Sequence, residues 1–125
     1  MTYTISWAVE DATVSTVAEA EAVLDRIAAS GGCYMTYVAP DPDDGNGPLI
    51  QMVWGDPERA WLAYTDEESG GWAVEPGLPP LTRDLDYDHG SIEPARTRLS
   101  AKAARAAVAE FVATGRRPTC VSWEE

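Results

Sequence analysis

The chain contains one histidine, His89, which lies beside Asp86 and Asp88 in the sequence DYDHG. A carboxylate next to an imidazole can orient the ring and stabilise its protonated form, as in the catalytic triads of hydrolases. Such a site also needs a nucleophile, and the sequence contains no G-x-S-x-G turn or equivalent. We therefore interpret His89 as a surface or strand-end residue. The alternative is a small enzyme or ligand-binding domain with a pocket near His89 and Asp86.

The two cysteines, Cys33 and Cys120, are far apart in the chain and lack the spacing of a zinc site. Only Arg116 and Arg117 lie near enough in the sequence to lower the pKa of Cys120. We expect both cysteines to be reduced and buried as small apolar side chains. The common nucleotide-binding motifs are also absent from the sequence. The sequence therefore predicts no catalytic residue, no cofactor and no metal ligand.

The segment DPDDGNG, which begins at Asp41, is similar to the start of a calcium-binding loop. An EF-hand loop needs an oxygen ligand at its fifth position, glycine at its sixth and glutamate at its twelfth. Counted from Asp41, those positions are Gly45, Asn46 and Met52. The pattern fails at all three, so we predict a solvent-exposed turn between two strands.

Acidic residues are concentrated in three short groups, which carry the strongest functional signal in the chain. Carboxylates so close together repel one another unless cations or a basic partner neutralise them. The third group alternates along an expected strand, which would place its carboxylates on one face. A tryptophan that follows the second group is a candidate apolar anchor. We predict that these residues bind a basic protein: Asp41, Asp43 and Asp44; Asp66, Glu67 and Glu68; Trp72; and Asp84, Asp86 and Asp88.

The formal net charge is −12, and it is unevenly distributed. Residues 1–95 carry 18 acidic and three basic residues, whereas residues 96–125 carry three acidic and six basic residues. Such a chain repels the phosphates of nucleic acids, and we expect no nucleic-acid binding. It attracts a basic protein and speeds their association. Because we find neither a signal peptide nor the roughly 18 apolar residues of a membrane-spanning helix, we expect a cytoplasmic protein that does not bind membranes.

The hydrophobic pattern predicts an α+β fold in one domain, residues 1–125. A mostly antiparallel sheet of about six or seven strands would carry two helices. A capping box at Thr16 and Glu19 begins a helix over about 16–30, and Ser100 begins a second helix over about 100–114. A turn is expected at residues 10 and 11. Candidate strands are 3–9, 12–14, 34–39, 49–55, 60–65, 71–75, 85–89 and 119–123.

Several segments resemble one family of bacterial immunity proteins. The second helix leads into FVATGRRP and then into a strand that ends VSW, over Phe111–Trp123. The first strand with Trp7, the helix that contains VLDRI and the segment AWLAYTDEESGGWAVE (Ala60–Glu75) precede them in the order that the family shows. Most of the chain therefore resembles the first-numbered (Imm-one) immunity protein family.

Members of that family are encoded beside polymorphic toxins, commonly nucleic-acid deaminases, including enzymes that act on cytosine in double-stranded DNA. The resemblance implies a bacterial antitoxin without enzymatic activity, which binds and neutralises a cognate basic toxin, expected to be a deaminase domain. Acidic side chains would occlude the toxin's substrate cleft, which must admit a negatively charged strand. The sequence leaves open the small enzyme or ligand-binding domain, an adaptor subunit of a larger assembly, and the oligomeric state.

Overall fold

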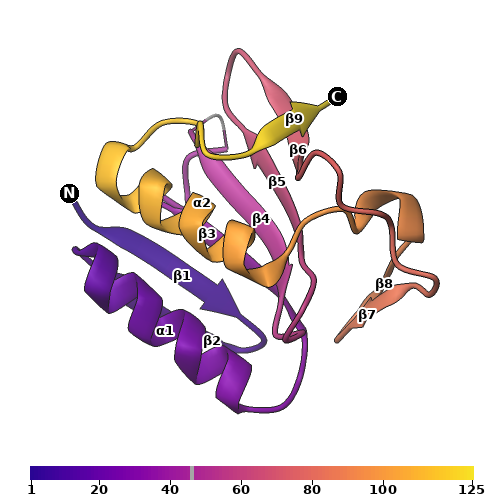
Figure 1. Ribbon diagram of the computed structural model, residues 1–125. Helices are drawn as coiled ribbons and strands as arrows, with labels where there is room; N and C mark the ends of the chain where they lie inside the picture. The colour runs from indigo at the N-terminus through magenta and orange to yellow at the C-terminus, as the bar shows by residue number, and fades with distance from the viewer. Residues whose placement is uncertain (46) are drawn as a thin grey trace.

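Two helices cover one face of a β-sheet in the computed structural model of the chain (Figure 1). The structure describes residues 1–45 and 47–125. Helix α1 spans Val17–Ala29. The hydroxyl of its capping residue, Thr16, accepts a hydrogen bond from the N–H of Glu19 at 3.1 Å, so the helix begins at the predicted capping box.

Helix α2 spans Ala101–Thr114. The hydroxyl of Ser100 accepts a hydrogen bond from the N–H of Ala103 at 3.0 Å and donates one to the carboxylate of Glu75 at 2.7 Å. The helix ends at Gly115, whose φ of 72° lies in the left-handed region that favours glycine. Both helices predicted from the sequence are confirmed.

Seven strands form one sheet in the order β2-β1-β3-β4-β5-β6-β9, and every neighbouring pair is antiparallel. Two further strands, β7 and β8, form a separate hairpin. The predicted α+β fold is therefore confirmed. The strands are β1 (Tyr3–Trp7), β2 (Glu10–Val14), β3 (Tyr34–Ala39), β4 (Leu49–Trp54), β5 (Trp61–Thr65), β6 (Gly70–Val74), β7 (Leu85–Tyr87), β8 (Gly90–Ile92) and β9 (Ser122–Glu124).

The main hydrophobic core lies between the sheet and the helices. Along β1 the buried side chains of Tyr3, Ile5 and Trp7 alternate with polar ones, so one side of the strand faces the helices. Helix α2 contributes Phe111, whose ring meets the ring of Tyr3 edge-on with 5.5 Å between centroids. This layer holds both helices against the sheet.

A second, smaller hydrophobic cluster lies on the opposite face of the sheet. Its buried members are Val53 of β4, Trp61 of β5 and Leu85 of β7. The segment between β6 and α2 carries the β7–β8 hairpin to this cluster (Figure 1). It covers only part of the face, and two hollows lie on the rest.

The first turn lies at Ala8 and Val9, not at residues 10 and 11 as predicted. The apolar side chain of Val9 extends the alternation of β1 in the sequence, but it is fully exposed. Ala8 adopts a φ of 49°, which reverses the chain, and β2 begins at once with Glu10. The predicted strand over 12–14 therefore starts earlier.

Two other strand predictions also need correction. The segment 85–89 is not one strand, because the chain turns at Asp88–His89 and returns as β8, which was not predicted. The last strand occupies Ser122–Glu124 instead of 119–123, because the Glu110 carboxylate holds the backbone N–H groups of residues 119 and 120 outside the sheet.

The predicted turn over DPDDGNG joins β3 to β4, and Asn46 in it lies outside the described residues. Neither α1 nor α2, the longer helices of the described ranges, could cross a membrane.

Candidate interaction surface

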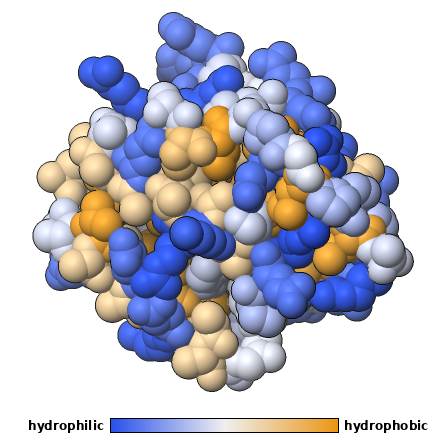
Figure 2. All heavy atoms as spheres, viewed as in Figure 1, coloured by the Kyte–Doolittle hydropathy of each residue, from blue (hydrophilic) through white to orange (hydrophobic). Residues whose placement is uncertain are grey.

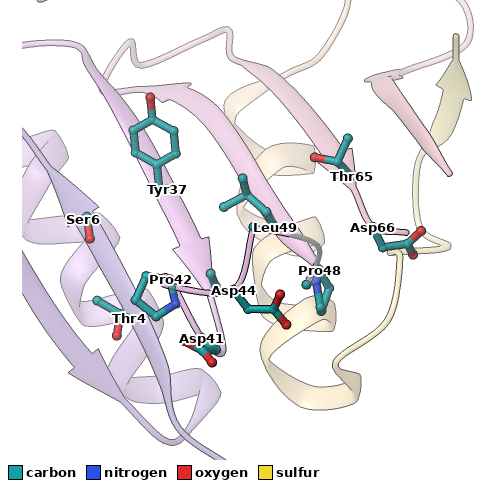
Figure 3. A pocket seen from close by; sticks show the side chains of 13 residues that line it. Thr4, Ser6, Tyr37, Asp41, Pro42, Asp44, Pro48, Leu49, Thr65 and Asp66 are labelled. Atoms are coloured by element: carbon teal, nitrogen blue, oxygen red, sulfur yellow. The ribbon is translucent and has the colours of Figure 1, made fainter. Parts of the chain in front are cut away.

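The side of the sheet that faces away from the helices is uncovered beside the β7–β8 hairpin, and we call this surface the open face. Ser6 of β1 pairs with Tyr37 of β3, which in turn pairs with Gln51 of β4. The side chain of Tyr37 is 42% exposed. Figure 3 shows this side of the sheet with the helices behind it. The open face consists of Thr4, Ser6, Tyr37, Leu49, Gln51 and Thr65.

A hollow of about 480 Å³ lies between Tyr37 and the loop that joins β3 to β4, and we call it the loop-side hollow (Figure 3). Its described lining includes the carboxylates of Asp41, Asp44 and Asp66 and no arginine or lysine. The phenol of Tyr64 donates a hydrogen bond to Asp66 at 2.8 Å. That bond, with backbone N–H groups of the following turn, holds the pKa of Asp66 below its ordinary value, so this carboxylate is charged at neutral pH.

A second hollow of about 470 Å³, the hairpin-side hollow, lies on the other side of Tyr37. The β7–β8 hairpin forms its wall with Asp88 and His89. The carboxylate of Asp88 accepts a hydrogen bond from the N–H of Met35 at 3.0 Å and lies 3.5 Å from the imidazole of His89. The His89 side chain is 82% exposed, so its surroundings do not hold the imidazole in the fixed orientation that catalysis needs.

The first two acidic groups lie together at one end of the sheet. Asp41 and Asp44 line the loop-side hollow with Asp66, whereas Asp43 is exposed on the same loop. The other two acidic residues, Glu67 and Glu68, occupy the turn between β5 and β6. There they line a neighbouring cleft, which adjoins the loop-side hollow at Asp44 and Asp66 and whose lining also includes Arg116 and Arg117, the two residues that follow Gly115.

The third acidic group is divided by the hairpin. Only Asp86 lies within β7, so the predicted strand face with three carboxylates does not exist. Asp86 borders a shallow cleft beside Cys33, and Asp84 is exposed before the strand. Of this group only Asp88 reaches the open face, at the end opposite to the loop-side hollow.

Trp72 is half-buried and packs against the second hydrophobic cluster. The guanidinium of Arg96 lies over its ring, 4.9 Å from the centroid. We therefore do not place Trp72 on the open face. Trp7 and Trp54 are buried in the main core, and Trp61 is buried in the second cluster.

The described residues hold no group of three or more histidine, cysteine or acidic side chains arranged to bind a metal ion. Cys33 is half-buried, but Cys120 is exposed, so its predicted burial is wrong. The sequence predicted that residues 120–123 alternate between the two faces of a strand, but β9 begins only at Ser122, so Cys120 lies before the strand. Partial desolvation and the neighbouring Glu110 carboxylate raise the pKa of the Cys120 thiol, which therefore is not activated as a nucleophile.

The sequence analysis did not identify Tyr37, the large side chain at the centre of the open face. A signal was present, because Thr36 and Val38 alternate with Met35 and Tyr37 along β3. Once the first pair is assigned to the core, Tyr37 must lie on the opposite side of the sheet. What the alternation could not indicate is whether another segment covers that side.

The chain matches the sequence model of a known protein family. This family model, described as immunity protein Imm1, matches residues 8–125, nearly the whole chain. The chain belongs to the Imm1 family of immunity proteins. No curated protein matches it significantly. Membership of the Imm1 family indicates a protein that binds and neutralises a cognate toxin, and a role as inhibitor rather than enzyme.

Proposed function

We propose that this Imm1 protein neutralises a nucleic-acid deaminase, one that acts on cytosine in DNA, by covering the basic surface with which the toxin holds its substrate. The observation that carries the proposal is the charge around the open face. The described lining of its two hollows includes four carboxylates, Asp41, Asp44, Asp66 and Asp88, and no arginine or lysine.

The charge of the whole chain supports the same kind of partner. A protein with a net charge of −12 attracts a basic surface over a distance and accelerates the encounter. Such attraction matters for an antitoxin, which must bind its target before the toxin reaches DNA. A deaminase that acts on DNA must itself carry a surface that attracts phosphates.

The deaminase is proposed on the resemblance of segments such as Phe111–Trp123 to a family whose toxin neighbours commonly are deaminases. A deaminase that acts on the cell's own DNA must be inhibited where that DNA lies. We therefore place the antitoxin in the cytoplasm of the bacterium that makes the toxin.

The test is to purify this chain and the toxin domain encoded next to it, and to measure their affinity at several salt concentrations. We expect a Kd below about 1 µM at low salt. The Kd should rise by about tenfold or more between roughly 50 and 500 mM NaCl, because salt screens the charges. Deamination of a double-stranded DNA substrate should stop at one equivalent of the chain.

Two results would contradict the proposal. A toxin domain that binds the chain but cleaves nucleic acid, or acts on another substrate, would exclude the deaminase. A complex in which the toxin still binds duplex DNA with unchanged affinity would exclude occlusion of the substrate surface. Cells that express the toxin and this chain together should survive, and cells that express the toxin alone should not.

A further inference from the structure

The proposed function leaves open which face of the molecule meets the toxin. Resting on that function, we infer that the toxin docks on the open face, with Tyr37 as the central anchor, and that it contributes a convex, basic element that enters the hollows on both sides of this ring. The toxin's part of the interface is thus convex, and the part that this chain contributes is concave.

The helix side of the molecule is a poorer match for a basic partner. Arg105 of α2 lies between Glu21 and Asp25 of α1 and forms ion pairs with both. Arg26 and Lys102 add further positive charge to the helices. Figure 2, viewed from this side, shows blue hydrophilic atoms interspersed with pale orange ones instead of one continuous patch.

The open face combines negative charge with an exposed aromatic ring. Tyr37 pairs with Ser6 on one side, and this short side chain leaves the ring accessible. Tyrosine is enriched among the residues that dominate binding energies, since it buries a large rigid area with little loss of conformational entropy. Met1 and Val9, the other large apolar side chains exposed in the described chain, lie at its start and at a turn.

The shape of the open face determines the shape of its partner. Tyr37 lines both hollows and separates them. The loop after β3 bounds one hollow with Asp41, and the hairpin bounds the other with Asp88. The two walls stand at opposite ends of β3, a six-residue strand that extends about 20 Å.

A surface hollowed in this way receives a projection from its partner and offers none from this chain. The chain therefore inhibits by holding the basic rim of the toxin's cleft, where phosphates bind, and not by inserting a side chain into the deaminase pocket. Lysine or arginine side chains on that rim would reach Asp41 and Asp66 at one end of the open face and Asp88 at the other.

The experiment compares four variants of this chain against the toxin domain encoded next to it. Tyr37→Ala removes the anchor, and Thr65→Arg places a cation in the loop-side hollow from an exposed position. We expect each to raise the Kd by at least about tenfold. Tyr37→Phe should retain most of the affinity. Ala22→Arg is the matched control, because it adds the same cation at an exposed position on helix α1, and its Kd should change by less than about threefold.

The outcomes separate this inference from the proposed function. If the wild-type chain does not bind the toxin, the proposed function is wrong. If the wild-type chain binds and Tyr37→Ala and Thr65→Arg bind equally well, the docking face is wrong, and loss of binding by Ala22→Arg would point to the helices. Melting temperatures of all variants, expected to stay within a few degrees of wild type, ensure that each comparison uses folded protein.

Variants of the toxin test the shape of the interface. Replacing the toxin's catalytic glutamate should leave its affinity for this chain unchanged, because the deaminase pocket is not entered. Replacing the basic residues that flank its cleft should weaken binding by about tenfold or more. The reverse pattern would show that this chain inserts into the pocket, and would overturn the inferred rim contact.

Discussion

The carboxylate of Asp88 accepts a hydrogen bond from the backbone N–H of Met35 at 3.0 Å, although 53 positions separate the two residues in the chain. In the same contact, the N–H of Asp88 donates to the carbonyl oxygen of Cys33 at 3.1 Å. These two bonds attach the β7–β8 hairpin to the start of β3. They therefore fix one wall of the open face.

Replacing Asp88 should show whether this contact positions the hairpin. Asp88→Ala removes the acceptor, and we expect hydrogen exchange at the Met35 amide to accelerate about tenfold, which corresponds to the loss of about one hydrogen bond. Asp88→Asn removes the charge but retains an acceptor oxygen, so exchange should change little. Asp86→Ala is the control, because Asp86 is exposed on the neighbouring strand. Equal exchange in Asp88→Ala and wild type would show that other contacts hold the hairpin.

The second strand of this hairpin could not be predicted from the sequence, although the helices and most strands of the sheet could. The helices were predictable because Thr16 and Ser100 mark their starts and Gly115 marks the end of the second. Strands β3, β4, β5 and β6 were predictable from their apolar runs and turns. Strand β8 was not, since Gly90–Ile92 has three residues and its pairing with β7 is stabilised by packing on Trp61 and its neighbours, which are distant in sequence.

The candidate site was less predictable than the fold. The sequence identified the acidic groups, but their positions depend on tertiary contacts. Asp41 and Asp66 line the same hollow because the β3–β4 and β5–β6 turns lie at the same end of the sheet, whereas strand β7 lies between Asp84 and Asp88. Tyr37 could be assigned to a face but not to an exposed position, because exposure depends on which segment covers that face.

Replacing the capping residue of each helix by alanine should lower the free energy of unfolding by different amounts. Ser100→Ala removes the acceptor of the Ala103 N–H and also the hydrogen bond that the Ser100 hydroxyl donates to the partly buried carboxylate of Glu75, whereas the backbone N–H of residue 100 can still donate to that carboxylate. We expect a loss of about 2 kcal/mol in the free energy of unfolding. Thr16→Ala, at the exposed cap of α1, should cost about 1 kcal/mol.

Urea denaturation at neutral pH measures both losses, and the difference between them is the informative quantity. The hydrogen bonds from Ser100 also lower the pKa of Glu75, so its carboxylate stays charged in the folded protein at neutral pH. The double variant Ser100→Ala, Glu75→Gln should therefore recover part of the stability. Equal losses in the two cap variants would show that Glu75 contributes nothing to the cap of α2.

Glu110 predicts a stability that depends on pH. Its carboxylate accepts hydrogen bonds from the N–H of Thr119 at 2.6 Å and of Cys120 at 3.1 Å, and thereby holds the segment between α2 and β9. Burial alone would raise the pKa of Glu110, but these hydrogen bonds together lower it below its ordinary value. A lowered pKa in the folded state stabilises the protein above the pKa of the unfolded chain, and this stabilisation is lost as the pH falls through the folded value.

Glu110→Gln should therefore lower the free energy of unfolding by about 1 kcal/mol at pH 7. This gap in stability between the variant and wild type should close as the pH falls below about 4. Urea denaturation at a series of pH values measures the gap, with Glu58→Gln, at an exposed position, as the control. A gap that stays constant down to about pH 3 would show that the charge of Glu110 does not hold the segment.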